Sequence, residues 1–273
     1  MGIDPHAAGQ ATDLDPFLAR ARKPTEIDAL RQQIREATLA ASLCIREPQF
    51  SRISARDVAV VFERYDALFF GASIPAALRG RELTFRLSTR ATSRGGSLRV
   101  WRPRETADGA RRAERYELSV STTLLFESFR GPGRPITIAG RECADRLDAL
   151  QRIVEHETVH LAEQLRWSET DCAAPRFQSI ARRLFGHTQH RHELVTPRER
   201  AAQLGLQPGH RVAFDFEGVR YEGILSRVTK RATVLVTHPD GRVMSDGNTY
   251  YQFYVPLERL GLTNASRPAR PPR

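Results

Sequence analysis

The period of the hydrophobic pattern changes three times along this chain, and this alternation limits the possible folds more than any other feature of the sequence. Residues 25–45 and 54–70 repeat apolar side chains at helical spacing. Residues 82–121 alternate with a period of two, residues 142–185 return to helical spacing, and the chain after Pro197 alternates again. Separate runs of helices and strands predict an α+β fold followed by a second, smaller β unit.

These patterns divide the chain into five predicted segments. A composition rich in Ala, Asp, Gly and Pro predicts a disordered tail at the N-terminal end, and Pro with Arg predicts another at the C-terminal end. Short strands after Pro197 are typical of an SH3-like barrel. The segments are a tail (1–24), a helical extension (25–54), an α+β domain with a small antiparallel sheet (55–196), an SH3-like β-barrel (197–262) and a tail (263–273).

Composition excludes several classes of protein. A hydrophobic fraction of 40% in 273 residues is incompatible with a wholly disordered chain. No window approaches the roughly 18 to 20 apolar residues that span a bilayer, and the N-terminal residues lack the pattern of a secretory signal, so we expect a cytoplasmic protein without a membrane partner. Three widely spaced cysteines form no disulfide framework. The sequence does not indicate an oligomeric state.

The segment His156-Glu157-Thr158-Val159-His160 is an H-E-x-x-H pentapeptide inside the predicted helix 142–167. Residues four apart on a helix lie one above the other, so His156 and His160 are placed to bind one metal ion. Zn²⁺ lowers the pKa of a bound water towards ~7. Glu157 is then placed to accept a proton from that water and to return it to the leaving amine. The motif therefore predicts a zinc hydrolase in which Glu157 is the catalytic general base.

The chain resembles the SprT-like zinc metalloprotease family over roughly residues 55–190. The resemblance implies a zincin-like, SprT-type domain, a Zn²⁺ cofactor and a polypeptide substrate. The stretches that carry it are Phe62–Phe70 with Ile74-Pro75, Arg86-Leu87-Ser88 with Gly95-Gly96, Glu117-Leu118-Ser119 with Thr123-Leu124-Leu125, His156–His160, and Pro175-Arg176-Phe177.

The third metal ligand is where the chain departs from this family. The family has a third histidine four residues before the phenylalanine that matches Phe177, and this chain has Ala173 there. A catalytic zinc needs three protein ligands and one open position. Cys172 is our predicted substitute, because thiolate is a good zinc ligand, and His187 is the alternative. Further candidates are His190, His192 and Glu163. A ligand set of His156, His160 and Glu163 spans about 10.5 Å of helix axis, which strains a single coordination sphere. We therefore expect Glu163 either to contact a ligand from behind or to be solvated.

The resemblance also implies how a polypeptide is held. Members of the family hold an extended chain beside the site by adding it to an edge strand of the sheet. In this chain the role falls to residues 116–121, with Tyr116, Leu118 and Ser119 as the predicted substrate-binding positions. An alternative reaction is the hydrolysis of a non-peptide amide, which the sequence does not distinguish from proteolysis because the metal and the base would be the same.

Half of the net charge of +10 lies beyond Pro197. Arg227, Lys230 and Arg231, together with an aromatic cluster at 250–254, predict a basic surface on which nucleic-acid bases can stack. Some SprT-like proteases act on DNA-associated proteins, so the resemblance implies DNA as a partner. The alternative function is a catalytically weak or inactive SprT-like protein that serves as a nucleic-acid or partner-binding adaptor. The missing family histidine motivates that alternative.

Overall fold

The computed structural model describes residues 14–102, 113–131 and 133–263. The chain forms two compact units that divide between Leu194 and Val195, and each is described by itself. Both contain helices and small sheets, so the predicted mixed α+β class is confirmed. Of the described helices, none is long and apolar enough to cross a membrane.

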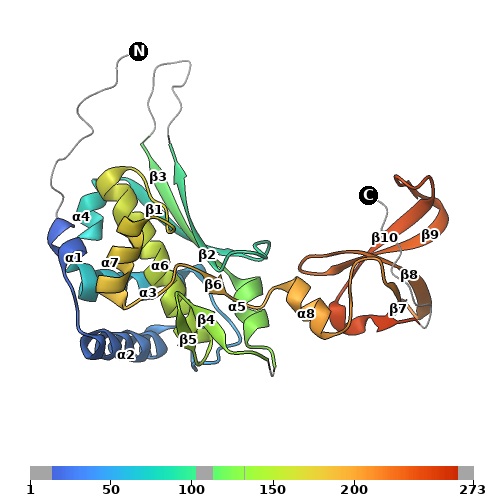
Figure 1. Ribbon diagram of the computed structural model, residues 1–273, viewed down its shortest axis with the longest axis horizontal. Coiled ribbons are helices and arrows are strands. Elements are labelled where there is room, and N and C mark those ends of the chain that lie inside the picture. Colours follow the sequence, from blue (N-terminus) through green and yellow to red (C-terminus); the bar gives the residue numbers. More distant parts are fainter. Residues whose placement is uncertain (1–13, 103–112, 132, 264–273) are drawn as a thin grey trace, which may run out of the picture. The chain divides into compact units, whose positions relative to one another are not determined.

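The first unit contains both helices and short strands (Figure 1). Its described helices are α1 (Asp15–Ala19), α2 (Pro24–Ala41), α3 (Ala55–Phe70), α4 (Ile74–Leu78), α5 (Thr122–Ser128), α6 (Arg146–Trp167) and α7 (Pro175–Phe185). Its described strands are β1 (Glu82–Ser88), β2 (Gly96–Trp101), β3 (Arg115–Ser121), β4 (Ile136–Ile138), β5 (Arg141–Cys143) and β6 (His192–Glu193).

Helix α6 lies at the centre of the first unit. It packs against α2, α3, α7 and β2, and nearly every residue from Leu147 to Leu165 is buried (Figure 1). Other elements pack against both the apolar and the polar side of α6, so that His156 is buried and His160 is half-buried.

The sheet beside α6 differs from the predicted antiparallel arrangement. Its strand order is β1-β3-β2, in which β3 pairs with β1 in parallel and with β2 in antiparallel orientation. Parallel pairing brings together strands that are distant in sequence, so the order of the strands is decided by tertiary packing. Strand β2 is the edge of this sheet next to α6, and β3 is its central strand.

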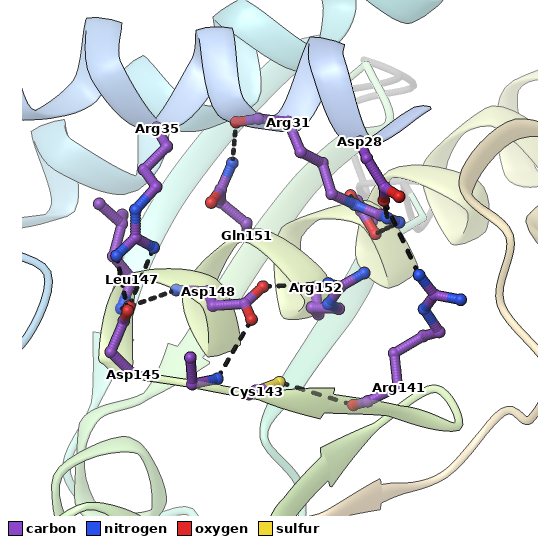
Figure 2. A network of polar contacts seen from close by, with 12 residues as sticks. Asp28, Arg31, Arg35, Arg141, Cys143, Asp145, Leu147, Asp148, Gln151 and Arg152 are labelled. Atoms are coloured by element: carbon purple, nitrogen blue, oxygen red, sulfur yellow. Dashed lines mark hydrogen bonds and ion pairs between the residues drawn. The ribbon is translucent and has the colours of Figure 1, made fainter. Parts of the chain in front are cut away.

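Helix α2 is fixed to the first half of α6 by charged groups (Figure 2). Asp145 caps α6 by accepting hydrogen bonds from the backbone N–H groups of Leu147 and Asp148. Arg35 on α2 donates two hydrogen bonds to the same carboxylate at 3.1 and 2.5 Å, and the resulting ion pair lowers the pKa of Asp145. The helical extension is therefore part of the first unit's packing.

Two local predictions in the first unit are wrong. Residues 1–13 of the predicted N-terminal tail lie outside the described residues, but residues 15–19 form α1, which buries Leu14 and Leu18 in contact with α7. The zinc-motif helix begins at Arg146 rather than near Glu142, because residues 141–143 pair with β4 as strand β5. The predicted helix at 54–70 is confirmed, and Ser54 caps its N-terminus with a side chain that accepts a hydrogen bond from the backbone of Asp57.

The second unit is built from one antiparallel sheet. Its strands are paired in the order β10-β9-β8-β7-β11, and the two end strands do not pair with each other among the described residues, so the predicted closed barrel is not seen. The described elements are α8 (Pro197–Gln203), β7 (Arg211–Phe216), β8 (Val219–Val228), β9 (Ala232–Val243), β10 (Thr249–Val255), a short 3-10 helix (Leu257–Arg259) and β11 (Gly261–Leu262). Of the predicted C-terminal tail, residues 264–273 lie outside the described residues.

Candidate metal centre

Two histidines on α6 direct the same nitrogen towards one point. The Nε2 atoms of His156 and His160 lie 3.2 Å apart. Two nitrogens bound to one tetrahedral zinc at ~2.0–2.1 Å are separated by about 3.3 Å, so the side chains already have the required spacing. Phe177 at the start of α7 packs against both rings, with centroid distances of 4.9 and 4.5 Å. The apolar contact restricts the rotation of each imidazole.

The pair opens into a cleft of about 430 Å³. Its lining comes from β2 and the loop before it, from α6, from the loops on either side of α7, and from β6. The lining residues are Arg94, Gly96, Ser97, Leu98, His156, Glu157, His160, Thr170, Asp171, Cys172, His190 and His192. The H-E-x-x-H residues therefore lie in a cavity that a small ligand or an extended chain can enter.

Glu157 is almost completely buried against β2. The loss of hydration raises the pKa of its carboxyl to about 8, although the backbone of Leu98 and the charge of Arg94 act in the opposite direction. One oxygen, Oε2, has no hydrogen-bond partner in the protein. A carboxyl group with a pKa near the working pH and a free oxygen is suited to proton transfer.

The motif histidines are held in the neutral form. Burial lowers the pKa of His156 well below its usual value, and burial lowers the pKa of His160 to about 4. Neutral imidazole is the form that binds metal. The electrostatic environment therefore prepares both side chains as ligands at physiological pH.

Cys172 is brought to the two motif histidines by the loop between α6 and α7. Its Sγ and one ring nitrogen each of His156 and His160 all lie within 4.8 Å of one another. Burial and the nearby Asp171 raise the pKa of the thiol. A coordinating metal deprotonates a thiol outright, so the donor set of two imidazoles and one thiolate fits zinc.

His192 on β6 is the second group that approaches the pair. Ligand atoms of His156, Glu157 and His192 lie within 4.8 Å of one another, and its ring is 4.5 Å from that of His156. Its Nε2 is buried and has no partner, and burial lowers its pKa to about 3. His192 therefore approaches the His156 and Glu157 side of the cleft, whereas Cys172 approaches both histidines of the H-E-x-x-H motif.

His187, the alternative third ligand, points to a different cluster. Its Nε2 lies 2.8 Å from Glu155, which also accepts hydrogen bonds from Arg31 and from the hydroxyl of Tyr65. All four side chains are buried. The His187 imidazole therefore forms a hydrogen bond with the buried Glu155 carboxylate, and His187 does not line the cleft.

The structure separates the two remaining candidate ligands. His190 lines the cleft, where its Nδ1 lies 3.5 Å from the side chain of Gln178. Glu163 is fully buried behind His160 and is bonded to Thr170 and Arg176. As expected from its spacing on the helix, Glu163 does not join the ligand atoms of His156 and His160.

The predicted substrate-binding strand is wrong. Tyr116, Leu118 and Ser119 belong to β3, whose two sides are already paired with β1 and β2, so no further strand can be added there. Tyr116 and Leu118 are buried, and Ser119 shares a hydrogen bond with Ser97 of β2. Among the described strands of this sheet, the edge beside the cleft is β2 instead.

The predicted nucleic-acid residues lie around one hairpin of the second unit. Arg227 is near the end of β8, and Lys230 and Arg231 form the turn into β9. Thr233 on β9 pairs with Arg227 on one side and with Tyr254 of β10 on the other. Tyr254 is 58% exposed, so a cationic and an aromatic side chain lie in one row across three strands.

Two residues of the site were missed by sequence reasoning. Gly96 begins β2, and a Cβ atom there would lie 2.6 Å from Oε1 of Glu157. Thr170 lies in the loop after α6, and its hydroxyl contacts Nδ1 of His160 at 2.7 Å. Gly96 acts through a contact with Glu157, which is distant in sequence, and Thr170 acts through the turn of the chain after α6, which the hydrophobic pattern does not define.

Comparisons with models of protein families, with curated proteins and with solved structures found no match to this chain. The resemblance to the SprT-like family therefore stays a prediction from the residues.

Proposed function

We propose that this protein is a zinc-dependent metallopeptidase with a zincin-like, SprT-type first unit. The observation that carries the proposal is the convergence of the His156 and His160 Nε2 atoms, 3.2 Å apart, beside a buried Glu157 in an open cleft. His156, His160 and Cys172 would hold Zn²⁺. When bound, the ion supplies a Lewis acid that polarises a carbonyl and activates water.

The chain's own residues supply proton transfer and orientation. Glu157 accepts a proton at Oε2, the atom without a protein partner, and returns it to the leaving nitrogen. His192 and Arg94 line the same cleft and are two of the groups that can donate to a carbonyl oxygen that gains negative charge. Gly96 leaves the space that the Glu157 carboxylate requires.

The edge of β2 is the proposed holder of a polypeptide substrate. Ser97 and Leu98 belong to this strand and line the cleft, so a peptide added to the free edge would pass beside Glu157. Backbone hydrogen bonds of this kind give affinity without requiring one particular sequence. We therefore expect cleavage of extended or unfolded polypeptides.

Zinc content and proteolysis test this function. Purified protein is expected to contain stoichiometric zinc by elemental analysis and to cleave casein. Glu157→Gln is expected to keep zinc and to lose about 10²–10⁴-fold in rate, because only the proton acceptor is removed. His156→Ala is expected to lose zinc as well. Protein that neither binds zinc nor cleaves casein would refute the proposal.

A matched pair of variants tests the third ligand. Cys172→Ala is expected to weaken zinc binding strongly, whereas His192→Ala is expected to retain the metal and to reduce cleavage. The reverse result would make His192 the ligand. If neither variant loses zinc, the centre has no third protein ligand of the proposed kind, and the alternative of an inactive adaptor gains support.

Nucleic-acid binding by the second unit, which we propose as an SH3-like module, is a second candidate function. The row of Arg227, Thr233 and exposed Tyr254, with Lys230 and Arg231 in the adjacent turn, favours it. Cations contact phosphates, and the exposed tyrosine offers a ring on which a base can stack. DNA is the proposed partner.

Fluorescence anisotropy with single-stranded DNA at several salt concentrations tests this candidate. Replacing the three cations with glutamine is expected to reduce the salt slope by about 2, since each lost phosphate contact removes about 0.7. Tyr254→Ala is expected to cost about 1–3 kcal/mol without changing that slope. Arg220→Gln, at the other end of β8, is the control. Affinity that does not fall with added salt would refute DNA binding.

A further inference from the structure

A chain of three hydrogen bonds joins His160 to the buried Glu163 and to Arg176. The Nδ1 atom of His160 lies 2.7 Å from the hydroxyl of Thr170. Thr170 donates to Oε2 of Glu163 at 2.8 Å, and Arg176 donates from Nε to Oε1 of the same carboxylate at 2.8 Å. The Glu163 side chain is fully buried, whereas Thr170 is half-buried. The proposed reaction uses none of these three residues directly.

The direction of each hydrogen bond follows from the groups involved. Both oxygens of the Glu163 carboxylate act as acceptors, Oε2 from the Thr170 hydroxyl and Oε1 from the Arg176 guanidinium. The single hydrogen of the Thr170 hydroxyl is therefore given to Glu163. The Thr170 oxygen must then accept from His160, so Nδ1 of His160 carries the hydrogen. In a neutral imidazole, the other nitrogen, Nε2, is left with a free lone pair.

We propose that Glu163 is a positioning residue that acts through Thr170 to hold His160 in the Nδ1–H tautomer. This inference rests on the proposed metal site, because there the free Nε2 lone pair of His160 coordinates the metal ion. That nitrogen is the atom 3.2 Å from Nε2 of His156. Partners on the far nitrogen of a metal-binding histidine fix its tautomer and its ring orientation, and losing them typically costs about 10–100-fold in metal affinity.

The opposite tautomer can be imposed with one nearly isosteric change. In Glu163→Gln, the side-chain oxygen still accepts from Arg176, so the amide NH₂ faces Thr170 and donates to it. The Thr170 hydroxyl then donates to Nδ1 of His160, and the hydrogen of the imidazole moves to Nε2, where it blocks metal binding. Thr170→Val removes the hydroxyl without changing the shape of the side chain, and Thr170→Ser restores it.

Two measurements test the proposal. Long-range ¹H–¹⁵N NMR of the metal-free protein distinguishes the two tautomers of His160, and competition with a chromophoric chelator gives the Kd for zinc. The natural chain and Thr170→Ser are expected to show Nδ1–H, and Glu163→Gln is expected to show Nε2–H. Zinc affinity is expected to fall about 10–100-fold in Glu163→Gln and Thr170→Val. Glu169→Gln is the control, because Glu169 is an exposed partner of the same Arg176.

The result that overturns the proposal is a His160 tautomer that does not change in Glu163→Gln, or a zinc Kd that does not change in Thr170→Val. If Glu163→Gln fails to fold, the Thr170→Val and Thr170→Ser pair still decides the question, because Thr170 is only half-buried. If the natural chain binds no zinc, the proposed function fails. The tautomer measurement is made without metal, so it separates that failure from a failure of this inference.

Discussion

Glu157 should destabilise the metal-free protein as the pH rises. Burial raises the pKa of its carboxyl from 4.5 to about 8, so the folded state holds a proton that the unfolded chain has already released. The full stability contribution of this proton is present below pH 4.5 and is lost as the pH rises towards 8. The pKa difference of about 3.5 units corresponds to about 5 kcal/mol in total, of which about 3 kcal/mol is lost by pH 7.

Glu157→Gln removes this titration and keeps the shape of the side chain. The free energy of unfolding of the variant relative to the natural chain should therefore increase by about 3 to 4 kcal/mol between pH 5 and pH 8. Urea unfolding of chelator-treated protein at several pH values measures this difference. Glu142→Gln, at an exposed position of β5, controls for the loss of a carboxylate.

Parallel pH profiles for Glu157→Gln and the natural chain would refute this reasoning. They would mean that the Glu157 carboxylate is hydrated in the folded protein, and the argument for a proton acceptor tuned by burial would fail with it.

Three further predictions concern packing around α6. Gly96→Ala should displace the Glu157 carboxylate, because the added Cβ would lie 2.6 Å from Oε1; casein cleavage should fall at least tenfold while zinc content stays constant. Asp145→Ala should lower the free energy of unfolding by about 1–2 kcal/mol in urea, because α6 loses its cap, and an unchanged midpoint would contradict the role of the cap. Glu155→Gln should cost up to about 3–5 kcal/mol, because the buried Arg31 loses its buried carboxylate partner and keeps only the exposed Asp28, and adding Arg31→Met should recover part of the loss.

The parts of the fold that sequence predicted are those decided by neighbouring residues. The α3 helix has an apolar face at helical spacing and a cap three residues before Asp57, so both its existence and its start were predictable. The same holds for the pairing of His156 with His160, because one helical turn fixes their relative position. Strand pairing was not predictable in this way. Strands β1 and β3 pair directly and in parallel although β2 lies between them in the sequence, and only the packing of the finished sheet selects that order.

The sequence by itself determined that a helix carries two histidines and a glutamate in a pattern suited to zinc, and that a separate β unit follows. The tertiary structure alone decided which distant groups surround them. It brought Cys172 to the histidine pair and turned His187 towards Glu155, although both were comparable candidates in the sequence. It also placed Thr170 behind His160. The physical reason is that a metal centre is assembled from side chains on separate elements, and the direction of each side chain depends on which buried partner satisfies it.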